Sequence, residues 1–474
     1  MIMHKREQFV LLFYTLFNVI SNHFIKFYSD ETYYWLWSKK LDFSYFDHPP
    51  MVAYLIKLTT LFGDDPLFVR LGAALMVSGT AYLLYALAKK MFDEQVALYT
   101  FYIFLSSLLT IVGATLITPD IPMMFFTTLM LYAAYIYIFE DKKSYLLLTG
   151  FAAGAAILSK YTGILIIFTL ILYVLLYKRE VFKEKYLLYA VLIATAVFAP
   201  VLYWNYTHDF ISFSFQLNHG ISEEKVFLAK EFKKFTSAQL VLFHPLYFLP
   251  LLYFIVVDKE RFEKKKVYLL LPFLFTLGFF TYHAAFKYAN AQWSAPAYLT
   301  ASILLGYYMA KYNMKKLLIA GVALSAFVMV AIKTPLGYTY LKPVEKALSR
   351  LGKIDNFQAE IEALHLDMES YDYILVDDYH GSEVAYYFNR PYTVLVLNKA
   401  RFSNFNIWRY EDLHIAMESP LKEIPHLGKC LYVGREKSHV KELSKLFKKT
   451  NKIAYMKKKL INRELEYYFV EFEN

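Results

Sequence analysis

Two adjacent carboxylates, Asp30 and Glu31, follow the first long apolar stretch of the sequence and begin a run of aromatic residues. A carboxylate at a membrane surface can act as a general base or a metal ligand, and aromatic rings beside it can bind sugar or prenyl surfaces. An interfacial aromatic belt with solvated acids explains this loop equally well. The other side chains of the loop that could contact a substrate are Tyr33, Tyr45, Asp47 and His48.

Two further charged residues lie at the ends of apolar stretches. Asp120 follows Thr118-Pro119 and has no countercharge near it in the sequence. Burying an unpaired carboxylate is costly, which favours a function for Asp120, although a helix N-terminus would also stabilise its charge. Lys160 lies between two apolar stretches, on the side of the membrane where lysine is disfavoured. We therefore expect Lys160 to have an anionic partner.

The remaining candidates lie in later loops and at the ends of apolar stretches. Arg70 ends the long first loop, and Lys287 lies in a short loop that also contains Asn290 and Trp293. Such loops predict cationic and hydrogen-bonding groups at one membrane surface. Two more candidate substrate-binding residues are Trp204 and Asn205.

Long apolar stretches must position these residues. The chain is 57% hydrophobic and only 19% charged, whereas soluble proteins are nearer 45–50% apolar and about 25% charged. A helix needs about 20 apolar residues to cross a bilayer, and stretches of that kind predict about eleven spans. The expected spans are 8–27, 70–90, 95–113, 120–140, 145–158, 161–177, 186–204, 238–257, 266–283, 295–311 and 315–332. The first is expected to be an uncleaved span.

Lysines and arginines gather in alternate loops, which the positive-inside rule assigns to the cytoplasm. The intervening loops are then extracytoplasmic, and they contain most of the candidate residues. The net charge of +10 is explained by these basic loops and does not indicate a nucleic-acid partner. We expect a multi-pass protein of the inner (plasma) membrane whose external loops are 28–69, 114–119, 159–160, 205–237 and 284–294.

The sequence changes character near residue 333. Residues 1–333 predict the transmembrane domain, with a long first external loop at 28–69, and residues 334–474 predict an extracytoplasmic soluble domain. Strands at 373–376, 393–396 and 431–433 and helices near 353–366, 381–389 and 437–448 predict a small α/β sheet layer. The single cysteine, Cys430, excludes an intramolecular disulfide and a multi-cysteine metal site.

The motifs together resemble the GT-C membrane glycosyltransferases. More narrowly, the sequence is similar to the bacterial branch of the dolichyl-phosphate-mannose protein mannosyltransferases and to the lipid A aminoarabinose transferases. The resemblance extends over about residues 28–300 and rests on Asp30-Glu31, the Tyr45–Pro50 segment, Arg70, Thr118–Asp120, Leu158–Lys160, Trp204-Asn205 and Asn290–Trp293. It implies an α-helical polytopic fold, a polyprenyl-phosphate-linked sugar donor, an external active site and inversion at the anomeric carbon.

The resemblance also implies roles for single residues. Asp30 matches an essential aspartate of the first loop, the expected general base or acceptor-orienting group, and Glu31 is its neighbour in the motif. Asp120 matches a second acidic position near the same cavity. Lys160 and Arg70 match basic positions that hold the donor phosphate, and Lys287 is a further candidate for that task. His48 and Asp47 stand where the aminoarabinose transferases have lysine and glutamate, which indicates a relative of those enzymes rather than the same enzyme.

The predicted activity is transfer of a hexose or pentose to a lipid A or other glycolipid, a polysaccharide or a protein. No cofactor is required by the pattern, although a divalent ion could be held by Asp30 and Asp120. The alternative function is a secondary transporter or flippase of lipid-linked saccharides, but transporters often have internal repeats, which this sequence lacks. A scaffold that binds lipid-linked sugars without turnover is a third interpretation.

Overall fold

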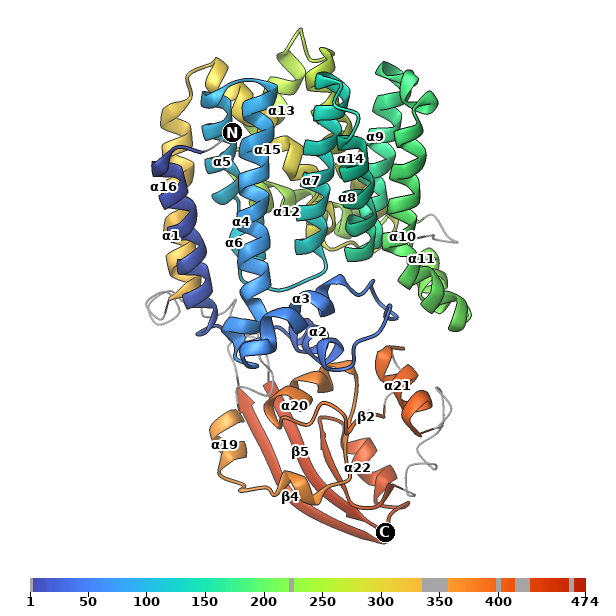
Figure 1. The fold of residues 1–474 in the computed structure, drawn as a ribbon. Helices are drawn as coiled ribbons and strands as arrows, with labels where there is room; N and C mark the ends of the chain where they lie inside the picture. Colours follow the sequence, from blue (N-terminus) through green and yellow to red (C-terminus); the bar gives the residue numbers. More distant parts are fainter. Residues whose placement is uncertain (1–2, 221–225, 335–356, 398–401, 414–426, 460–463) are drawn as a thin grey trace. The chain divides into compact units, whose positions relative to one another are not determined.

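The computed structural model describes residues 3–220, 226–334, 357–397, 402–413, 427–459 and 464–474 (Figure 1). The chain divides into two compact units. The first comprises Met1–His23 and Phe43–Val330, and the second comprises Phe24–Asp42 and Ala331–Asn474. The second unit therefore includes a segment that the sequence assigns to the first external loop of the membrane domain.

The described part of the first unit is built from helices, as the apolar stretches predict. Most of them run roughly parallel or antiparallel in a bundle, which Figure 1 shows. The helices are α1 (Lys5–Asn22), α3 (Met51–Thr59), α4 (Pro66–Met91), α5 (Glu94–Leu105), α6 (Leu108–Gly113), α7 (Asp120–Glu140), α8 (Tyr145–Ser159), α9 (Ile164–Tyr177), α10 (Lys185–Thr207), α11 (Ile211–Gly220), α12 (Ala229–Phe243), α13 (Phe248–Val257), α14 (Lys264–Phe286), α15 (Ala297–Lys311) and α16 (Lys315–Lys333).

The predicted spans each fall on one helix or on consecutive helices, but their number is not confirmed. Among the described residues, five helices are long and apolar enough to cross a membrane, namely α4, α7, α10, α14 and α16. The pair α12–α13, bent by 96°, adds a sixth if it forms one span. Helices α8 and α9 contain only 15 and 14 residues, fewer than the roughly 20 that a bilayer requires. Short helices thus account for most of the difference from about eleven.

Close helix packing in the first unit depends on small residues. A Cβ atom added at Gly150 of α8 would collide with the backbone of Ala190 in α10, and one at Gly154 would lie 2.7 Å from the carbonyl oxygen of Ala194. Two glycines four residues apart lie on one helix face, so the backbones of α8 and α10 can approach each other. This contact fixes the helix that ends at Lys160.

A buried ion pair joins the start of α14 to the residue that follows α13, and a tyrosine of α15 contacts the same carboxylate. Lys266 is fully buried, and its Nζ lies 2.9 Å from Oδ2 of Asp258. The hydroxyl of Tyr308 in α15 donates to the same oxygen at 3.0 Å. Lys266 therefore differs from the solvated cytoplasmic cation that its loop position suggests, because its charge is neutralised within the helix bundle.

The second unit contains a five-stranded mixed sheet in the order β2-β1-β3-β5-β4. The strands are β1 (Tyr373–Val376), β2 (Val394–Val396), β3 (Cys430–Gly434), β4 (Lys449–Lys459) and β5 (Glu464–Glu473), and the helices are α2 (Ser29–Lys39), α19 (Gln358–Glu362), α20 (Ser382–Tyr387), α21 (Asn404–Leu413) and α22 (Lys437–Leu443). Strands β2, β1 and β3 are parallel, and β5 and β4 are antiparallel to their neighbours. The three predicted strands are found at nearly their predicted positions, and residues 353–356 of the first predicted helix lie outside the described residues.

Two long strands, β4 and β5, were not predicted. Most side chains of β5 are buried or half-buried, and Phe469 and Phe472, three residues apart, are buried on opposite faces of the sheet. Strand β4 is rich in lysine and mostly exposed, and its sequence resembles a solvated loop more than a strand. Lysines on an edge strand also discourage pairing with another chain. Residues 449–459 therefore form a strand because they pair with β5, although their lysine-rich sequence does not predict one.

Polar contacts at the carboxyl end of β1 centre on Asp377, which is buried. Its Oδ1 contacts Nδ1 of His439 at 2.8 Å and accepts a hydrogen bond from the Tyr432 hydroxyl at 2.6 Å, and Oδ2 accepts from the N–H of Arg435 at 2.5 Å. Burial alone would raise the pKa of Asp377, but these hydrogen bonds outweigh it and lower the pKa. The hydrogen bond to Asp377 raises the pKa of His439 despite its partial burial.

The thiol of Cys430 in β3 is expected to be unreactive in this fold. Cys430 is fully buried in the sheet, and burial raises the pKa of its thiol to about 12. The thiol therefore stays protonated at neutral pH, and a thiol in this state is a poor nucleophile.

We predict that the His439–Asp377 pair stabilises the protein mainly at mildly acidic pH. Because the folded-state pKa of His439 is raised, its contribution is complete below the unfolded value of about 6.5 and is lost as pH rises through the raised pKa. Because the pKa of Asp377 is lowered, its contribution is present above about 3.9 and is lost as pH falls through the lowered pKa. Thermal unfolding of the full chain in detergent should therefore show the largest difference between the wild type and His439→Gln at about pH 4–6.5. A difference that is constant from acidic to alkaline pH would contradict this ion pair.

Candidate functional site

The strongest charged contact among the candidate residues lies between the ends of α7 and α8. Nζ of Lys160 lies 2.7 Å from Oδ1 and 2.9 Å from Oδ2 of Asp120. Both side chains are largely buried, with 8% of the lysine and 13% of the aspartate exposed. Asp120 is the first residue of α7, where the helix dipole also favours its charge. The anionic partner expected for Lys160 is therefore Asp120. Each charge neutralises the other, which accounts for the burial of both side chains.

A polar network continues from the residue after Lys160. The Tyr161 hydroxyl and the Ser212 hydroxyl lie 3.0 Å apart, and Ser212 donates to Oδ1 of Asn205 at 2.6 Å. The N–H of Phe213 donates to the same oxygen at 3.3 Å. Asn205 thus fixes the start of α11 relative to α10. Its amide oxygen is occupied by these contacts, which gives this predicted substrate-binding residue a structural task.

Arg70 and Trp204 are both deeply buried. Nη1 of Arg70 in α4 donates to the carbonyl oxygen of Asn22 at 2.9 Å, at the end of α1, and the whole side chain is 0% exposed. The indole of Trp204 in α10 stacks on the ring of His208 with centroids 4.0 Å apart. A positive guanidinium at the C-terminus of α1 is favoured by the helix dipole. Both residues therefore help to hold the helices in place.

The predicted substrate-binding segment around Asp47 packs against α11. The amide of Gln216 donates to the carbonyl oxygen of Asp47 at 2.8 Å, and the rings of Phe46 and Phe215 lie 4.5 Å apart. Tyr45 is fully buried, whereas His48 is partly exposed. The segment is therefore a packed loop rather than a solvated one.

The later candidates lie around the start of α15. Lys287 follows the last residue of α14, and Oδ1 of Asn290 accepts a hydrogen bond from the Tyr288 hydroxyl at 2.6 Å. Trp293 lies beside Phe280, with ring centroids 6.1 Å apart. Buried Gln239 of α12 supports this segment, because its Oε1 accepts hydrogen bonds from Ser294 and Tyr298 at 2.7 Å each.

Asp30 and Glu31 lie in the first turn of α2, within the second unit. The carboxylate of Glu31 is fully buried and accepts a hydrogen bond from the N–H of Tyr28 at 3.0 Å. Glu31 therefore caps the helix that contains Asp30. Asp30 itself is partly exposed, and the helix N-terminus stabilises its charged form.

Helix α2 is anchored to the α/β fold of its own unit by buried polar groups. The Ser29 hydroxyl donates to Oε1 of Glu383, and the hydroxyls of Thr32 and Ser382 lie 2.9 Å apart. The Tyr33 hydroxyl accepts a hydrogen bond from the N–H of Asn404 at 2.8 Å. Ser29, Thr32, Ser382 and Glu383 are each at most 5% exposed. The second unit therefore sets the position and orientation of the helix that contains Asp30.

The described residues contain no preformed cluster of metal-ligating side chains. Across the described residues, no three His, Cys, Asp or Glu side chains lie together in a way that could hold a metal ion. The carboxylate of Asp120 is also engaged by Lys160. Binding of a divalent ion by Asp30 and Asp120 therefore stays a hypothesis.

Several residues of these sites had no clear signal in the sequence. Ser382 and Glu383 are about 350 positions from the start of α2, and in the sequence they indicate either a helix cap or part of an acceptor cleft. The sequence gives no sign of the contact between Tyr161 and Ser212, which depends on the fold.

We predict that Asp120 and Lys160 stabilise the first unit as a pair. Lys160→Met leaves a carboxylate buried without its countercharge and should lower the free energy of unfolding by about 3–5 kcal/mol. Asp120→Asn combined with Lys160→Met removes both charges and should recover most of this loss. Thermal and chemical unfolding in detergent measure both effects. Lys143→Met, which breaks the more exposed ion pair of Lys143 with Glu184, is the matched control and should change little. Equal losses in the single and double variants would contradict the pairing.

We also predict that Glu383 holds α2 in place. Glu383→Ala leaves the Ser29 hydroxyl without this acceptor and should destabilise the packing of α2 by about 1–3 kcal/mol. Hydrogen exchange followed by mass spectrometry should then show faster exchange of the amides of residues 29–39. The control Glu369→Ala changes a side chain that is 90% exposed. Unchanged exchange in α2 would show that the contact does not anchor the helix.

Comparison with known proteins identifies relatives in sequence and in fold. The sequence model of the family dolichyl-phosphate-mannose-protein mannosyltransferase matches residues 47–204, a range that contains Arg70, Asp120 and Lys160. The lipid A galacturonosyltransferase RgtD of Rhizobium johnstonii is 25% identical over 303 residues. This alignment covers 62% of the chain and 63% of RgtD, so the chain spans less than two thirds of that relative.

The fold is similar to that of ArnT from Cupriavidus metallidurans. The apo crystal structure of ArnT superposes with a TM-score of 0.72 over 98% of both chains, at 14% sequence identity. The structure of ArnT bound to undecaprenyl phosphate has the same TM-score and covers 99% of this chain. The family match, the relative and the fold all confirm the resemblance to GT-C membrane glycosyltransferases that the sequence motifs indicate.

Proposed function

We propose that this protein transfers a sugar from a polyprenyl-phosphate donor to an extracytoplasmic acceptor, with inversion at the anomeric carbon. The relatives support the proposal, because RgtD is a lipid A galacturonosyltransferase and ArnT binds undecaprenyl phosphate. The proposed location is the inner membrane, with the active site and the second unit on the outside.

The buried Lys160–Asp120 pair is the observation that carries the proposal. A leaving polyprenyl phosphate gains negative charge on its bridging oxygen as the glycosidic bond breaks. A cation already fixed in a region of low dielectric stabilises that charge without reorganisation, and such preorganisation is usually the largest catalytic contribution. Asp120 holds the Lys160 ammonium in one position, and an ammonium group has three N–H donors. A donor phosphate oxygen can therefore join the pair.

Two other cations complete the proposed donor site in different ways. Arg70 is fully buried and bound to the end of α1, so its charge would act on the phosphate through the field of the site. Lys287 follows the last helical residue of α14, where a flexible side chain can reach a phosphate. Trp293 and Asn290 lie in the same segment and would contact the prenyl or sugar portion.

Asp30 is the proposed general base. An acceptor hydroxyl attacks the anomeric carbon from the face opposite the phosphate, a new C–O bond forms, and the C–O bond to the phosphate breaks. The hydroxyl proton passes to the Asp30 carboxylate, and polyprenyl phosphate leaves as an anion with the bonding electron pair. General base catalysis of this kind contributes about 10²–10⁴-fold. Glu31 and Glu383 would orient Asp30 through α2.

We predict that Asp30→Asn abolishes most sugar transfer without preventing donor binding. The assay supplies a panel of radiolabelled polyprenyl-phosphate sugars to the purified protein with total membrane lipid and protein as acceptors. Transfer by Asp30→Asn should fall by about 10²–10⁴-fold, whereas Asp64→Asn, a carboxylate change elsewhere in the 28–69 loop, should keep wild-type activity. Lys160→Met combined with Asp120→Asn should instead weaken donor binding.

The same assay separates the enzyme from its alternatives. Label that the wild type transfers to lipid or protein, and that Asp30→Asn does not, supports the transferase. A wild-type protein that binds the donors but transfers label from none of them would contradict it. Movement of an intact lipid-linked saccharide across a vesicle membrane, with no cleavage of its phosphate bond, would indicate the transporter or flippase instead.

A further inference from the structure

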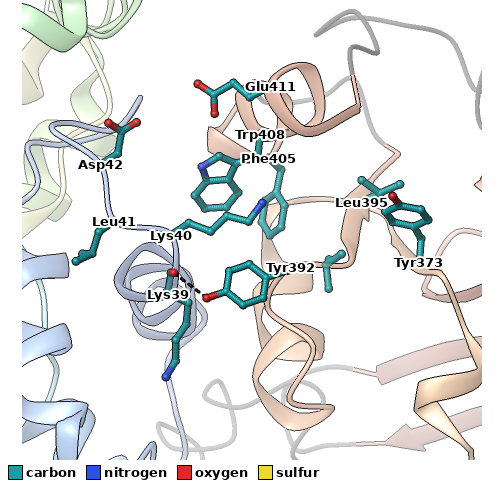
Figure 2. A pocket seen from close by; sticks show the side chains of 11 residues that line it. Lys39, Lys40, Leu41, Asp42, Tyr373, Tyr392, Leu395, Phe405, Trp408 and Glu411 are labelled. Atoms are coloured by element: carbon teal, nitrogen blue, oxygen red, sulfur yellow. Dashed lines mark hydrogen bonds between the residues drawn. The ribbon is translucent and has the colours of Figure 1, made fainter.

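The second unit contains a cavity of about 600 Å³ at the C-terminal end of α2 (Figure 2). All its lining residues belong to this unit, and they come from α2 and the segment after it, from β1, from β2 and the residues just before it, and from α21. The volume is within the range of about 300–1,000 Å³ that is common for small-molecule sites. The lining residues that matter for recognition are Lys40, Asp42, Tyr392, Phe405, Trp408 and Glu411.

Aromatic rings and charges of both signs alternate around this cavity. Nζ of Lys40 lies 5.2 Å from the ring centroid of Trp408 and 5.9 Å from that of Tyr392. Figure 2 shows Lys40 extending between these rings, with the carboxyl groups of Asp42 and Glu411 above them in this view. Tyr392 is 59% exposed, and its hydroxyl donates to the carbonyl oxygen of Lys39 at 3.0 Å. Much of this tyrosine is therefore accessible to a ligand, beside cationic and anionic side chains.

This combination fits a saccharide better than a prenyl chain. A pyranose ring has an apolar C–H face that packs on an aromatic ring, and hydroxyl groups at its edge that donate to carboxylates and accept from ammonium groups. A prenyl chain has no hydrogen-bonding groups and would replace water beside the charged groups of Lys40, Asp42 and Glu411, which is costly. Lysine would in addition favour a phosphate group on the sugar.

Helix α2 links the cavity to the proposed general base. Asp30 is in the first turn of α2, and Lys39 is its last residue. Nine residues of helix correspond to about 14 Å. Because Ser29 and Thr32 anchor the start of the helix to Ser382 and Glu383, this separation is set by a rigid element. A bound oligosaccharide could therefore occupy the cavity with one end while the other end reaches Asp30.

We propose that this cavity is the acceptor subsite and binds the saccharide portion of a glycolipid or glycan acceptor. The inference rests on the proposed transfer reaction and adds the class of its acceptor. Tyr392 provides the stacking face, Asp42 and Glu411 accept hydrogen bonds from sugar hydroxyls, and Lys40 contacts a hydroxyl or phosphate group. The cavity determines which acceptor is held, and Asp30 acts on the hydroxyl that reaches it.

Direct binding tests the subsite independently of catalysis. The full-length protein in nanodiscs is titrated with a glucosamine disaccharide, in phosphorylated and unphosphorylated forms, and binding is followed by calorimetry. Tyr392→Ala and Glu411→Gln should each weaken binding by about tenfold, the effect of losing one contact of about 1.4 kcal/mol. The matched controls are Tyr455→Ala, a tyrosine on β4 that is 51% exposed, and Glu369→Gln, and they should bind as the wild type does. A preference for the phosphorylated form that disappears in Lys40→Met would assign the phosphate contact.

The outcomes separate this inference from the transfer reaction itself. Asp30→Asn should bind the disaccharides as tightly as the wild type while transferring sugar about 10²–10⁴-fold more slowly. If the wild type transfers sugar but Tyr392→Ala and Glu411→Gln leave both disaccharide binding and the acceptor KM unchanged, the cavity is not the acceptor subsite. If the wild type binds neither disaccharide, the same conclusion follows. Binding that these variants weaken, in a protein that transfers nothing, would keep the saccharide site and overturn the proposed function. Binding of a glycolipid in the nanodisc but not of the free disaccharides would contradict recognition through the saccharide alone.

Discussion

Neutralisation of charge among apolar helices is the constraint on which the structure of the first unit depends. Each buried charge in this environment requires a partner, because an isolated ion loses several kcal/mol of solvation there. Lys160 is paired with Asp120, and Lys266 is paired with Asp258. The first pair joins the ends of two helices at the proposed donor site, and the second joins a loop to the bundle. The same physical requirement thus accounts for the pair at the proposed donor site and for the pair that only holds the helices together.

The proposed chemistry divides between the two units in a way that follows from their composition. The donor needs a fixed cation in an environment poor in water, which apolar helices provide around Lys160. The acceptor needs hydrogen-bonding groups and an aqueous approach, which an α/β unit with polar loops provides. Helix α2 belongs to the second unit, although it follows the first apolar helix directly in sequence. The proposed base, Asp30, lies on a helix that Glu383 and Ser382 anchor, so the C-terminal residues would help to position it in the proposed reaction.

The sequence predicted the helices, the three parallel strands and the partnership of Lys160 because these depend on local patterns. Apolar stretches predict helices, and a lysine among apolar residues predicts an anion. The anchoring of α2 depends instead on contacts between residues more than 350 positions apart, which no local pattern shows. Strand β4 was missed because its lysines resemble a solvated loop. Substrate binding by Asn205 stays a prediction, whereas its hydrogen bond with Ser212 is a contact that only the fold reveals.

The extent of the family match agrees with this division of tasks. The matched range, residues 47–204, contains the donor candidates Arg70, Asp120 and Lys160, and it leaves out α2, the sheet and the cavity at Tyr392. Stabilising a departing phosphate requires the same chemistry whichever sugar moves, so one arrangement of charges serves many enzymes. Recognising an acceptor requires a surface that differs with each acceptor. The features of this chain that distinguish it from its relatives are therefore expected in the second unit, where Tyr392, Asp42 and Glu411 surround the cavity.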